Sequence, residues 1–189
     1  MSEKRKKNKE LVEERVLLDA AGIESALDRL AGEILRRNDS RKLFLVGIRT
    51  GGVYLAQRMQ ERILSSARYE VPLGVMDITL YRDDIVEGLP RPDVGPTELP
   101  SELEGKNVIL IDDVLFTGRT VRSALVELMD FGRPESIQLC VLVDRGHREL
   151  PIHADFVGLK IETQRDQSVV VFLKELGEKD GVSLFRRAR

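Results

Sequence analysis

Hydrophobic residues follow two alternating patterns along the chain. After Asp19, a predicted helix N-cap, apolar residues recur at spacings of three and four from Ile23 to Leu35, which indicates an amphipathic helix. The unbroken apolar run at 43–48 instead predicts a buried strand. Both patterns recur further on, predicting helices over 53–63 and 121–129 and strands over 71–80, 108–111, 137–143, 154–159 and 169–173.

Strand and helix signals alternate from residue 19 to residue 143. This order predicts an α/β fold, in which a central parallel sheet is covered by helices on both faces. Ligands in such folds sit beyond the carboxyl ends of the strands. The two segments that fall there, after Ile48 and after Ile111, therefore carry the candidate chemistry.

Length and composition place limits on the class of protein. The chain has 189 residues, which suggests one domain, and its 42% hydrophobic and 33% charged residues suit a globular protein. A net charge of −2 argues against a polycation built as a whole for nucleic acid. We expect a cytoplasmic protein, because no apolar stretch approaches the roughly 20 residues of a membrane span and none follows the basic N-terminus. The one cysteine, Cys140, lies in a predicted strand and is expected to be buried.

Two segments differ in amino-acid composition from the rest of the chain. Residues 1–15 are rich in lysine and arginine, and we interpret them as a basic mobile arm that precedes one domain over 16–189. Between Arg82 and Gly105 four prolines interrupt the chain. This excursion is too long for an ordinary connection, so we interpret residues 82–105 as a mobile loop that closes over a ligand. The alternative is a solvated insertion without a role.

The segment from Val108 to Thr120 joins two kinds of chemistry. The predicted strand delivers Asp112 and Asp113 to the ligand edge of the sheet, and a helix opens at 117–120 with hydroxyls, a glycine and free amides. Such a helix start is a good cradle for a phosphate. Two carboxylates would repel a phosphate, so they are better suited to sugar hydroxyls or a cation. Together the two parts predict a site for a phosphorylated sugar held at both ends.

The run from Val108 to Thr120 closely resembles the phosphoribosyl-pyrophosphate signature of type I phosphoribosyltransferases. Segments 77–84, 132–134 and 143–151 are similar to one subfamily, the bifunctional pyrimidine operon regulators and uracil phosphoribosyltransferases. The likeness extends from about residue 16 to the end, so the basic arm lies outside it.

The resemblance implies a type I phosphoribosyltransferase fold, with the parallel sheet joined by a small hood. It implies that uracil and phosphoribosyl pyrophosphate (PRPP) give UMP and pyrophosphate, with Mg²⁺ carried by PRPP rather than assigned to protein ligands. It also implies binding to the leader of pyrimidine (pyr) mRNA when UMP or UTP is bound, which promotes transcription attenuation. Family members are expected to be homodimers or homotetramers.

The resemblance also assigns roles to residues. Thr50 and Gly51 would form the pyrophosphate loop, Arg82 would open the mobile loop, and Arg145 and Val169 would flank the base. The aspartates of the signature would hold the ribose hydroxyls, and 117–120 would hold the 5′-phosphate. The PRPP-binding residues would be Asp112, Asp113, Val114, Leu115, Phe116, Thr117, Gly118, Arg119 and Thr120.

One departure from the family pattern keeps other functions open. The pyrophosphate loop usually reads Thr-Arg-Gly, whereas this chain has Thr50, Gly51 and Gly52. The missing guanidinium would have contacted an anion bidentately, so an RNA-binding regulator whose pocket only senses nucleotide is one alternative. A salvage enzyme without an RNA role is another. A purine phosphoribosyltransferase shares the phosphate loop, but segment 145–151 argues against it.

Overall fold

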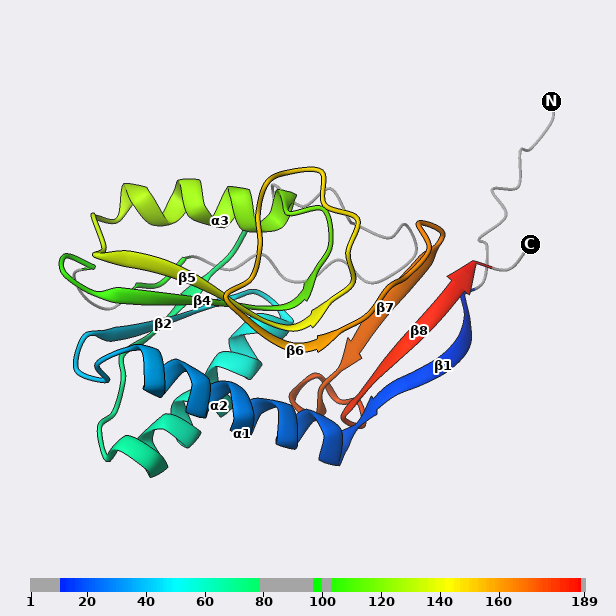
Figure 1. The fold of residues 1–189 in the computed structure, drawn as a ribbon, viewed down its shortest axis with the longest axis horizontal. Helices are drawn as coiled ribbons and strands as arrows, with labels where there is room; N and C mark the ends of the chain where they lie inside the picture. The colour runs from blue at the N-terminus through cyan, green and yellow to red at the C-terminus, as the bar shows by residue number, and fades with distance from the viewer. Residues whose placement is uncertain (1–10, 79–96, 100–102, 188–189) are drawn as a thin grey trace.

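A five-stranded parallel sheet forms the centre of the protein, in a computed structural model that describes residues 11–78, 97–99 and 103–187 (Figure 1). Its strand order is β3-β2-β4-β5-β6, and every neighbouring pair is parallel. The strands are β2 (Leu43–Ile48), β3 (Leu73–Met76), β4 (Asn107–Leu115), β5 (Ser136–Asp144) and β6 (Phe156–Lys160).

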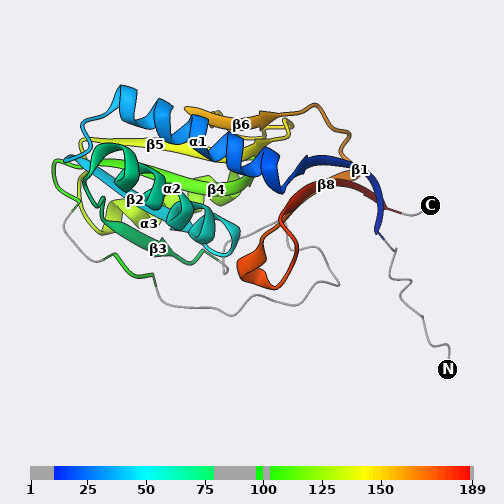
Figure 2. The same ribbon diagram turned by 90° about the horizontal axis from the view of Figure 1, so that it is seen from below.

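Helices cover both faces of this sheet, as the alternating sequence pattern predicts. Helices α1 (Ala20–Arg37) and α2 (Gly51–Ala67) pack on one face, and α3 (Arg119–Asp130) packs on the other. Figure 2 shows α1 and α2 side by side over the sheet. The predicted N-cap at Asp19 is confirmed, because its side chain accepts a hydrogen bond from the Gly22 amide at 2.8 Å.

Buried residues alternate between the two faces along the central strands. In β4, Ile109 and Ile111 join the core under α1 and α2, whereas Val108 and Leu110 join the core under α3. Successive side chains of a strand point to opposite faces, so a strand covered on both sides has to be apolar throughout. Cys140 in β5 is buried as expected, and burial raises the pKa of its thiol to about 12.

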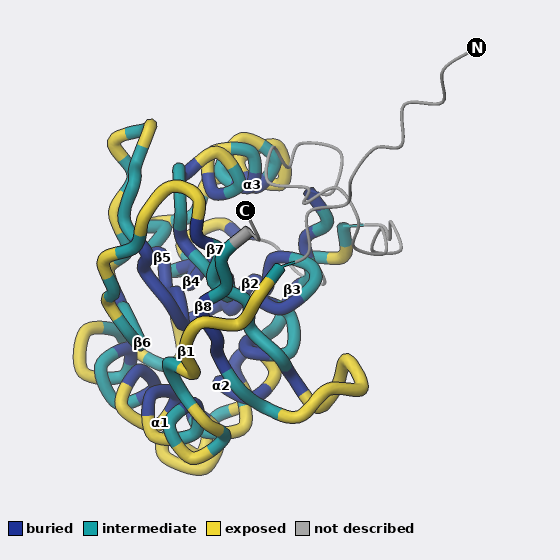
Figure 3. Tube along the Cα trace, turned by 90° about the vertical axis from the view of Figure 1, so that its right-hand side faces the viewer, coloured by how far each residue is buried: buried dark blue, intermediate teal, exposed yellow. Residues whose placement is uncertain are grey.

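A smaller antiparallel sheet forms the hood. Its order is β1-β8-β7, with β1 (Leu11–Asp19), β7 (Gln167–Phe172) and β8 (Gly181–Arg187). Figure 1 shows this sheet beyond the end of the main sheet toward which β5 and β6 run. In Figure 3, β1 is largely exposed while the central strands are buried. Among the described residues, none of the helices is long and apolar enough to cross a membrane.

A buried arginine on α2, Arg58, connects the hood to the helices that cover the main sheet. The Arg58 guanidinium donates hydrogen bonds to Glu175 and Asp180 at 2.7–2.9 Å, and its side chain is only 6% exposed. Both carboxylates lie in the turn between β7 and β8, which includes the short 3-10 helix Lys174–Leu176. Hydrogen bonds from Arg58 lower the pKa of Glu175 and of Asp180. The cluster therefore fixes the hood against α2 through charge.

Several predicted boundaries need correction. Residues 11–15, predicted to belong to the mobile arm, instead form the start of β1, and residues 1–10 lie outside the described part of the chain. The strand predicted over 71–80 is β3, which spans only Leu73–Met76, while residues 79 and 80 lie outside the described part of the chain. Arg82 and most of the predicted mobile loop lie outside the described residues. Near the end of that loop, Glu98 pairs with Val75 through two backbone hydrogen bonds of 2.9 and 2.8 Å.

Candidate active site

The two aspartates of the signature lie within β4, the middle strand of the main sheet. The strand was predicted to end at Ile111 but continues to Leu115, so Asp112 and Asp113 stand inside it rather than after it. Asp112 is 3% exposed and accepts a hydrogen bond from the Asp113 amide at 2.9 Å. Asp113 accepts one from the Val114 amide at 2.8 Å. One oxygen of each carboxylate thus binds the backbone, which fixes the direction of the other.

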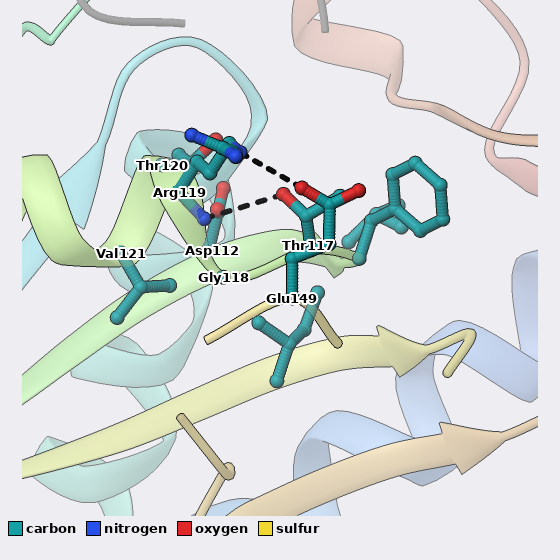
Figure 4. A pocket seen from close by; sticks show the side chains of 10 residues that line it. Asp112, Thr117, Gly118, Arg119, Thr120, Val121 and Glu149 are labelled. Atoms are coloured by element: carbon teal, nitrogen blue, oxygen red, sulfur yellow. Dashed lines mark hydrogen bonds and ion pairs between the residues drawn. The ribbon is translucent and has the colours of Figure 1, made fainter. Parts of the chain in front are cut away.

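A cavity of about 250 Å³ opens at this end of β4 (Figure 4). Every residue from Asp112 to Thr120 except Asp113 lines it, together with Val121 and Glu149. The residues predicted from the signature are therefore brought together around one hollow. Asp113 faces the neighbouring loop at Gly51 instead.

The start of α3 brings backbone amides to the lining of this cavity. The helix begins at Arg119, and Gly118 before it has φ of +93°, a conformation that strongly favours glycine. The first amides of a helix have no intrahelical acceptor. Among the described residues, the amides of Thr117, Gly118 and Thr120 donate to no protein acceptor. This arrangement suits an anion, which the helix dipole also favours.

Glu149 contributes a carboxylate to the same cavity. Its Oε2 accepts a hydrogen bond from Arg119 Nε at 2.9 Å, as Figure 4 shows. The Glu149 amide donates to the Thr117 carbonyl at 3.0 Å, so the backbone joins the two segments as well. The sequence signals a resemblance over 143–151, but nothing in the spacing predicts that Glu149 reaches the signature loop.

Arg145 connects the signature loop to the hood. Its guanidinium carbon lies 4.0 Å from the centroid of the Phe116 ring, and its Nη2 donates to the carbonyls of Gln167 at 2.6 Å and Gln164 at 3.1 Å. Nε donates to Thr163 Oγ1 at 3.2 Å. Arg145 is 6% exposed, and this burial lowers the pKa of its guanidinium.

Val169 lies in the hood and is partly buried. It is on β7, opposite Leu184 of β8, and packs against the core beneath α1 and α2. The structure thus places Arg145 at the boundary between signature loop and hood, with Val169 two residues beyond Gln167, whose carbonyl Arg145 binds.

The second predicted loop, after β2, packs closely against β4. A Cβ added at Gly51 would lie 2.6 Å from Asp113 Oδ2, and one at Gly52 would lie 2.3 Å from the Ile111 carbonyl oxygen. Neither distance is compatible with a side chain unless something moves, so these glycines allow the loop and the acidic strand to touch. Thr50 immediately precedes α2, which begins at Gly51. The preceding Arg49 pairs with Asp77 at 3.5 Å.

Protein ligands for a metal ion are sparse in this region. Within the described ranges, no three His, Cys, Asp or Glu side chains converge in a way that would hold an ion. The carboxylates of Asp112 and Asp113 are hard oxygen donors, and Mg²⁺ is usually bound by one or two such groups together with substrate phosphates and water. The donor set thus suits an ion that arrives with a phosphorylated ligand.

Comparison with known proteins identifies the class to which this fold and site belong. The family model described as "Phosphoribosyl transferase domain" matches residues 15–177. Among solved structures, a hypoxanthine phosphoribosyltransferase from Staphylococcus aureus superposes with a TM-score of 0.67 and 23% identity, covering 90% of this chain and 92% of the other. At that level of identity, the likeness shows the phosphoribosyltransferase fold and not the substrate.

Curated relatives specify the family more narrowly. A protein from Geobacter sp. (strain M21) named "Bifunctional protein PyrR" is 56% identical over 162 residues, which is 85% of this chain and 92% of the relative. One of the same name from Roseiflexus sp. (strain RS-1) is 51% identical over 175 residues, 92% of this chain and 96% of the relative. The chain belongs to the bifunctional PyrR family of phosphoribosyltransferases.

Proposed function

We propose that this protein transfers the phosphoribosyl group of PRPP to uracil, giving UMP and pyrophosphate, and that it also regulates pyrimidine biosynthesis by binding pyr leader mRNA. Membership of the bifunctional PyrR family supports both roles. The observation that carries the enzymatic role is the cavity at the end of β4, where a buried acid and a cradle of backbone amides face one hollow.

The acidic end of β4 and the start of α3 suit the two ends of a ribose phosphate. Asp112 and Asp113 would accept hydrogen bonds from the ribose hydroxyls, because ionised carboxylates are the strongest acceptors among side chains. The amides and hydroxyls of Thr117, Gly118, Arg119 and Thr120 would surround the 5′-phosphate. Val114, Leu115 and Phe116 line the hollow between these groups.

The remaining assigned residues would surround the pyrophosphate and the base. Gly51, which follows Thr50, adjoins Asp113 of β4, and this suits a loop that binds the leaving pyrophosphate through its amides. Arg82 would add a positive charge from the 82–105 loop, which would close over the pyrophosphate. Arg145 and Val169 would flank the uracil ring from the end of β5 and from β7. Within the described part of the chain, the hydrogen bonds from Arg145 to Thr163, Gln164 and Gln167 use Nε and Nη2, so Nη1 would be the nitrogen that faces a pyrimidine carbonyl.

In this reaction the protein has mainly to position the ribose and the base and to stabilise the charge that develops. As the bond to pyrophosphate breaks, the ribose carbon becomes cation-like, so a fixed ribose and a fixed base supply most of the rate enhancement. When bound with PRPP, Mg²⁺ neutralises charge on the pyrophosphate. The protein would hold the sugar through Asp112 and Asp113 and would exclude water when the 82–105 loop closes.

The RNA-binding role would require a basic surface and a response to nucleotide. Exposed arginines occur on β1 and α1, including Arg15 and Arg36. Assembly into a homodimer or homotetramer would bring copies of this surface together. UMP or UTP in the cavity would then favour the state that binds the mRNA leader and promotes transcription attenuation.

One assay tests the enzymatic proposal and its alternatives. Purified protein is incubated with PRPP, Mg²⁺ and labelled uracil, hypoxanthine or guanine, and the nucleotide product is measured. We expect UMP from uracil and no product from either purine. If nucleotide forms from hypoxanthine or guanine instead, the substrate is a purine and not uracil. If UMP binds but no base is converted, the pocket is a sensor without catalysis, which the glycine at position 51 favours as the second candidate.

A further inference from the structure

Arg148 binds the backbone of the signature loop at several points at once. Its Nη1 lies 2.6 Å from the Phe116 carbonyl oxygen and 3.0 Å from that of Gly146, and its Nε donates to the Ile152 carbonyl at 3.0 Å. Its side chain is only 17% exposed. A guanidinium presents five donors in a rigid planar fork, and here the fork is committed to main-chain oxygens on two segments of the chain.

Asp144 fixes the orientation of this guanidinium. Asp144 Oδ2 lies 2.5 Å from Arg148 Nη2, and Oδ1 accepts a hydrogen bond from the Gly146 amide at 3.0 Å. Asp144 is the last residue of β5, next to Leu115 of β4 in the parallel ladder. Asp144 therefore anchors Arg148 to the paired strands β4 and β5 rather than to a loop.

The consequence for the signature loop follows from peptide geometry. In a trans peptide the carbonyl of one residue and the amide of the next point in opposite directions. The Phe116 carbonyl points to Arg148, and the Thr117 carbonyl points to the amides of Glu149 and Leu150 at 3.0 and 3.3 Å. The next amides, those of Thr117 and Gly118, are therefore turned away from the 146–150 segment. Two successive amides that turn to one side form an anion-binding concavity.

We propose that Arg148 is a positioning residue for the 5′-phosphate of the substrate and product, acting through the carbonyl of Phe116. Arg148 does not line the cavity, so its effect passes through the backbone that it orients. The inference rests on the proposed function, in that the cavity is assigned to a ribose 5-phosphate. It adds a residue and a mechanism that the signature itself does not contain.

Replacement by lysine isolates this role. A lysine keeps the positive charge beside Asp144, but its ammonium is a single point and does not bind carbonyls on two segments through a planar fork. In Arg148→Lys we expect UMP to bind about tenfold more weakly, the size of losing one hydrogen bond to a charged group. Uridine, which lacks the phosphate, should bind as it does to the unaltered protein. The KM for PRPP should rise while kcat and the KM for uracil change about twofold or less.

A matched control is available on the other side of the sheet. Arg29 on α1 also binds two main-chain carbonyls, those of Val157 at 3.0 Å and Gly158 at 2.6 Å, away from the cavity. Arg29→Lys removes a comparable clamp, and we expect the ratio of UMP to uridine affinity to stay unchanged. Asp144→Asn provides a second test in which Arg148 itself is retained, with a loss of UMP affinity in the same direction.

The measurement is calorimetric titration of each variant with UMP and with uridine, beside steady-state kinetics. An unchanged ratio of UMP to uridine affinity in both Arg148→Lys and Asp144→Asn would overturn the proposal, as would an equal loss for both ligands. The unaltered protein separates this result from failure of the proposed function. If it binds UMP no better than uridine, the cavity is not a phosphate site at all.

Discussion

Gly51 lies directly against the carboxylate of Asp113. A Cβ at Gly51 would be 2.6 Å from Asp113 Oδ2 and 3.0 Å from its Cγ. The start of α2 and the acidic end of β4 are therefore in contact, and the absence of a side chain at residue 51 allows the Asp113 carboxylate to lie where it does. This contact gives the departure from the family's Thr-Arg-Gly pattern a structural meaning, because a side chain here and the present position of Asp113 are incompatible.

The first prediction tests that contact. In Gly51→Ala the added methyl group has to displace the Asp113 carboxylate, and we expect about tenfold weaker PRPP binding, because small misplacements of binding groups are costly. Stability should change little, since the displaced atoms are the end of a flexible side chain. Gly32→Ala on α1 is the control, because its Cβ would meet nothing closer than Arg36 Nη1 at 3.4 Å. Equal PRPP affinity in both variants would show that Asp113 does not depend on Gly51.

The second prediction concerns the acidic pair itself. Asp113→Asn keeps the shape of the side chain but replaces a carboxylate by a weaker acceptor, so PRPP should bind about tenfold more weakly. The melting temperature should stay within a few degrees, because Asp113 is partly exposed and lies at the site rather than in the core. Calorimetric titration with PRPP makes the measurement. Unchanged affinity would remove Asp113 from the site.

The third prediction separates two roles for Arg145. If its guanidinium reads the base, Arg145→Ala should weaken uracil and UMP binding strongly while changing PRPP binding much less. The substitution also removes the contact with Phe116 and the hydrogen bonds to the hood, so we expect a cost of about 2 kcal/mol in stability. Phe116→Leu is the companion variant, since it removes the ring and leaves the arginine in place. Equal weakening of both ligands in Arg145→Ala would make the residue structural.

Local pattern in the sequence accounts for the main sheet and for β7 of the hood, predicted as a strand over 169–173, but not for β1 and β8. The apolar run at 43–48 coincides with β2, because a strand buried on both faces leaves an unbroken hydrophobic segment. The end of β4 is missed because Asp112 and Asp113 interrupt its apolar run, although the ladder with β5 continues to Leu115. Functional sites are where such conflicts between local pattern and fold are expected.

The hood strands and the ring of contacts around the cavity depend on tertiary structure. β1 is mostly exposed, and its partner β8 lies at the other end of the chain, so no local spacing predicts that the two strands pair. Arg148 and Glu149 likewise reach the signature loop from the segment after β5. The sequence did mark that segment as a candidate site, because it is polar and follows a buried strand at the ligand edge of the sheet. Its partners become visible only when β4 and β5 are placed side by side.

The fourth prediction concerns the charge cluster that holds the hood. Removing the guanidinium in Arg58→Met leaves Glu175 and Asp180 without their shared partner, and we expect a loss of about 3 kcal/mol at pH 7. Because Arg58 lowers the pKa of both carboxyls below 4.5 and 3.8, their contribution is present above those values and is lost as pH falls through the lower folded-state values. The stability difference between the two proteins should therefore shrink below about pH 4.5. Urea unfolding at pH 7, 5 and 3 measures this, and a constant difference would contradict it.

The fifth prediction concerns RNA. A regulator of this family has to meet many phosphates, so its affinity for pyr leader RNA should fall steeply with salt, by a slope of about 0.7 in log affinity per neutralised phosphate of a single strand. UMP should strengthen binding only through its higher affinity for the RNA-binding state. Deleting residues 1–10 should cost little, whereas Arg15→Gln with Arg36→Gln should lower both the affinity and the salt slope, since both side chains are exposed. Filter binding at several salt concentrations, with and without UMP, makes the measurement. If no complex forms at low salt with nucleotide present, the protein is a salvage enzyme alone.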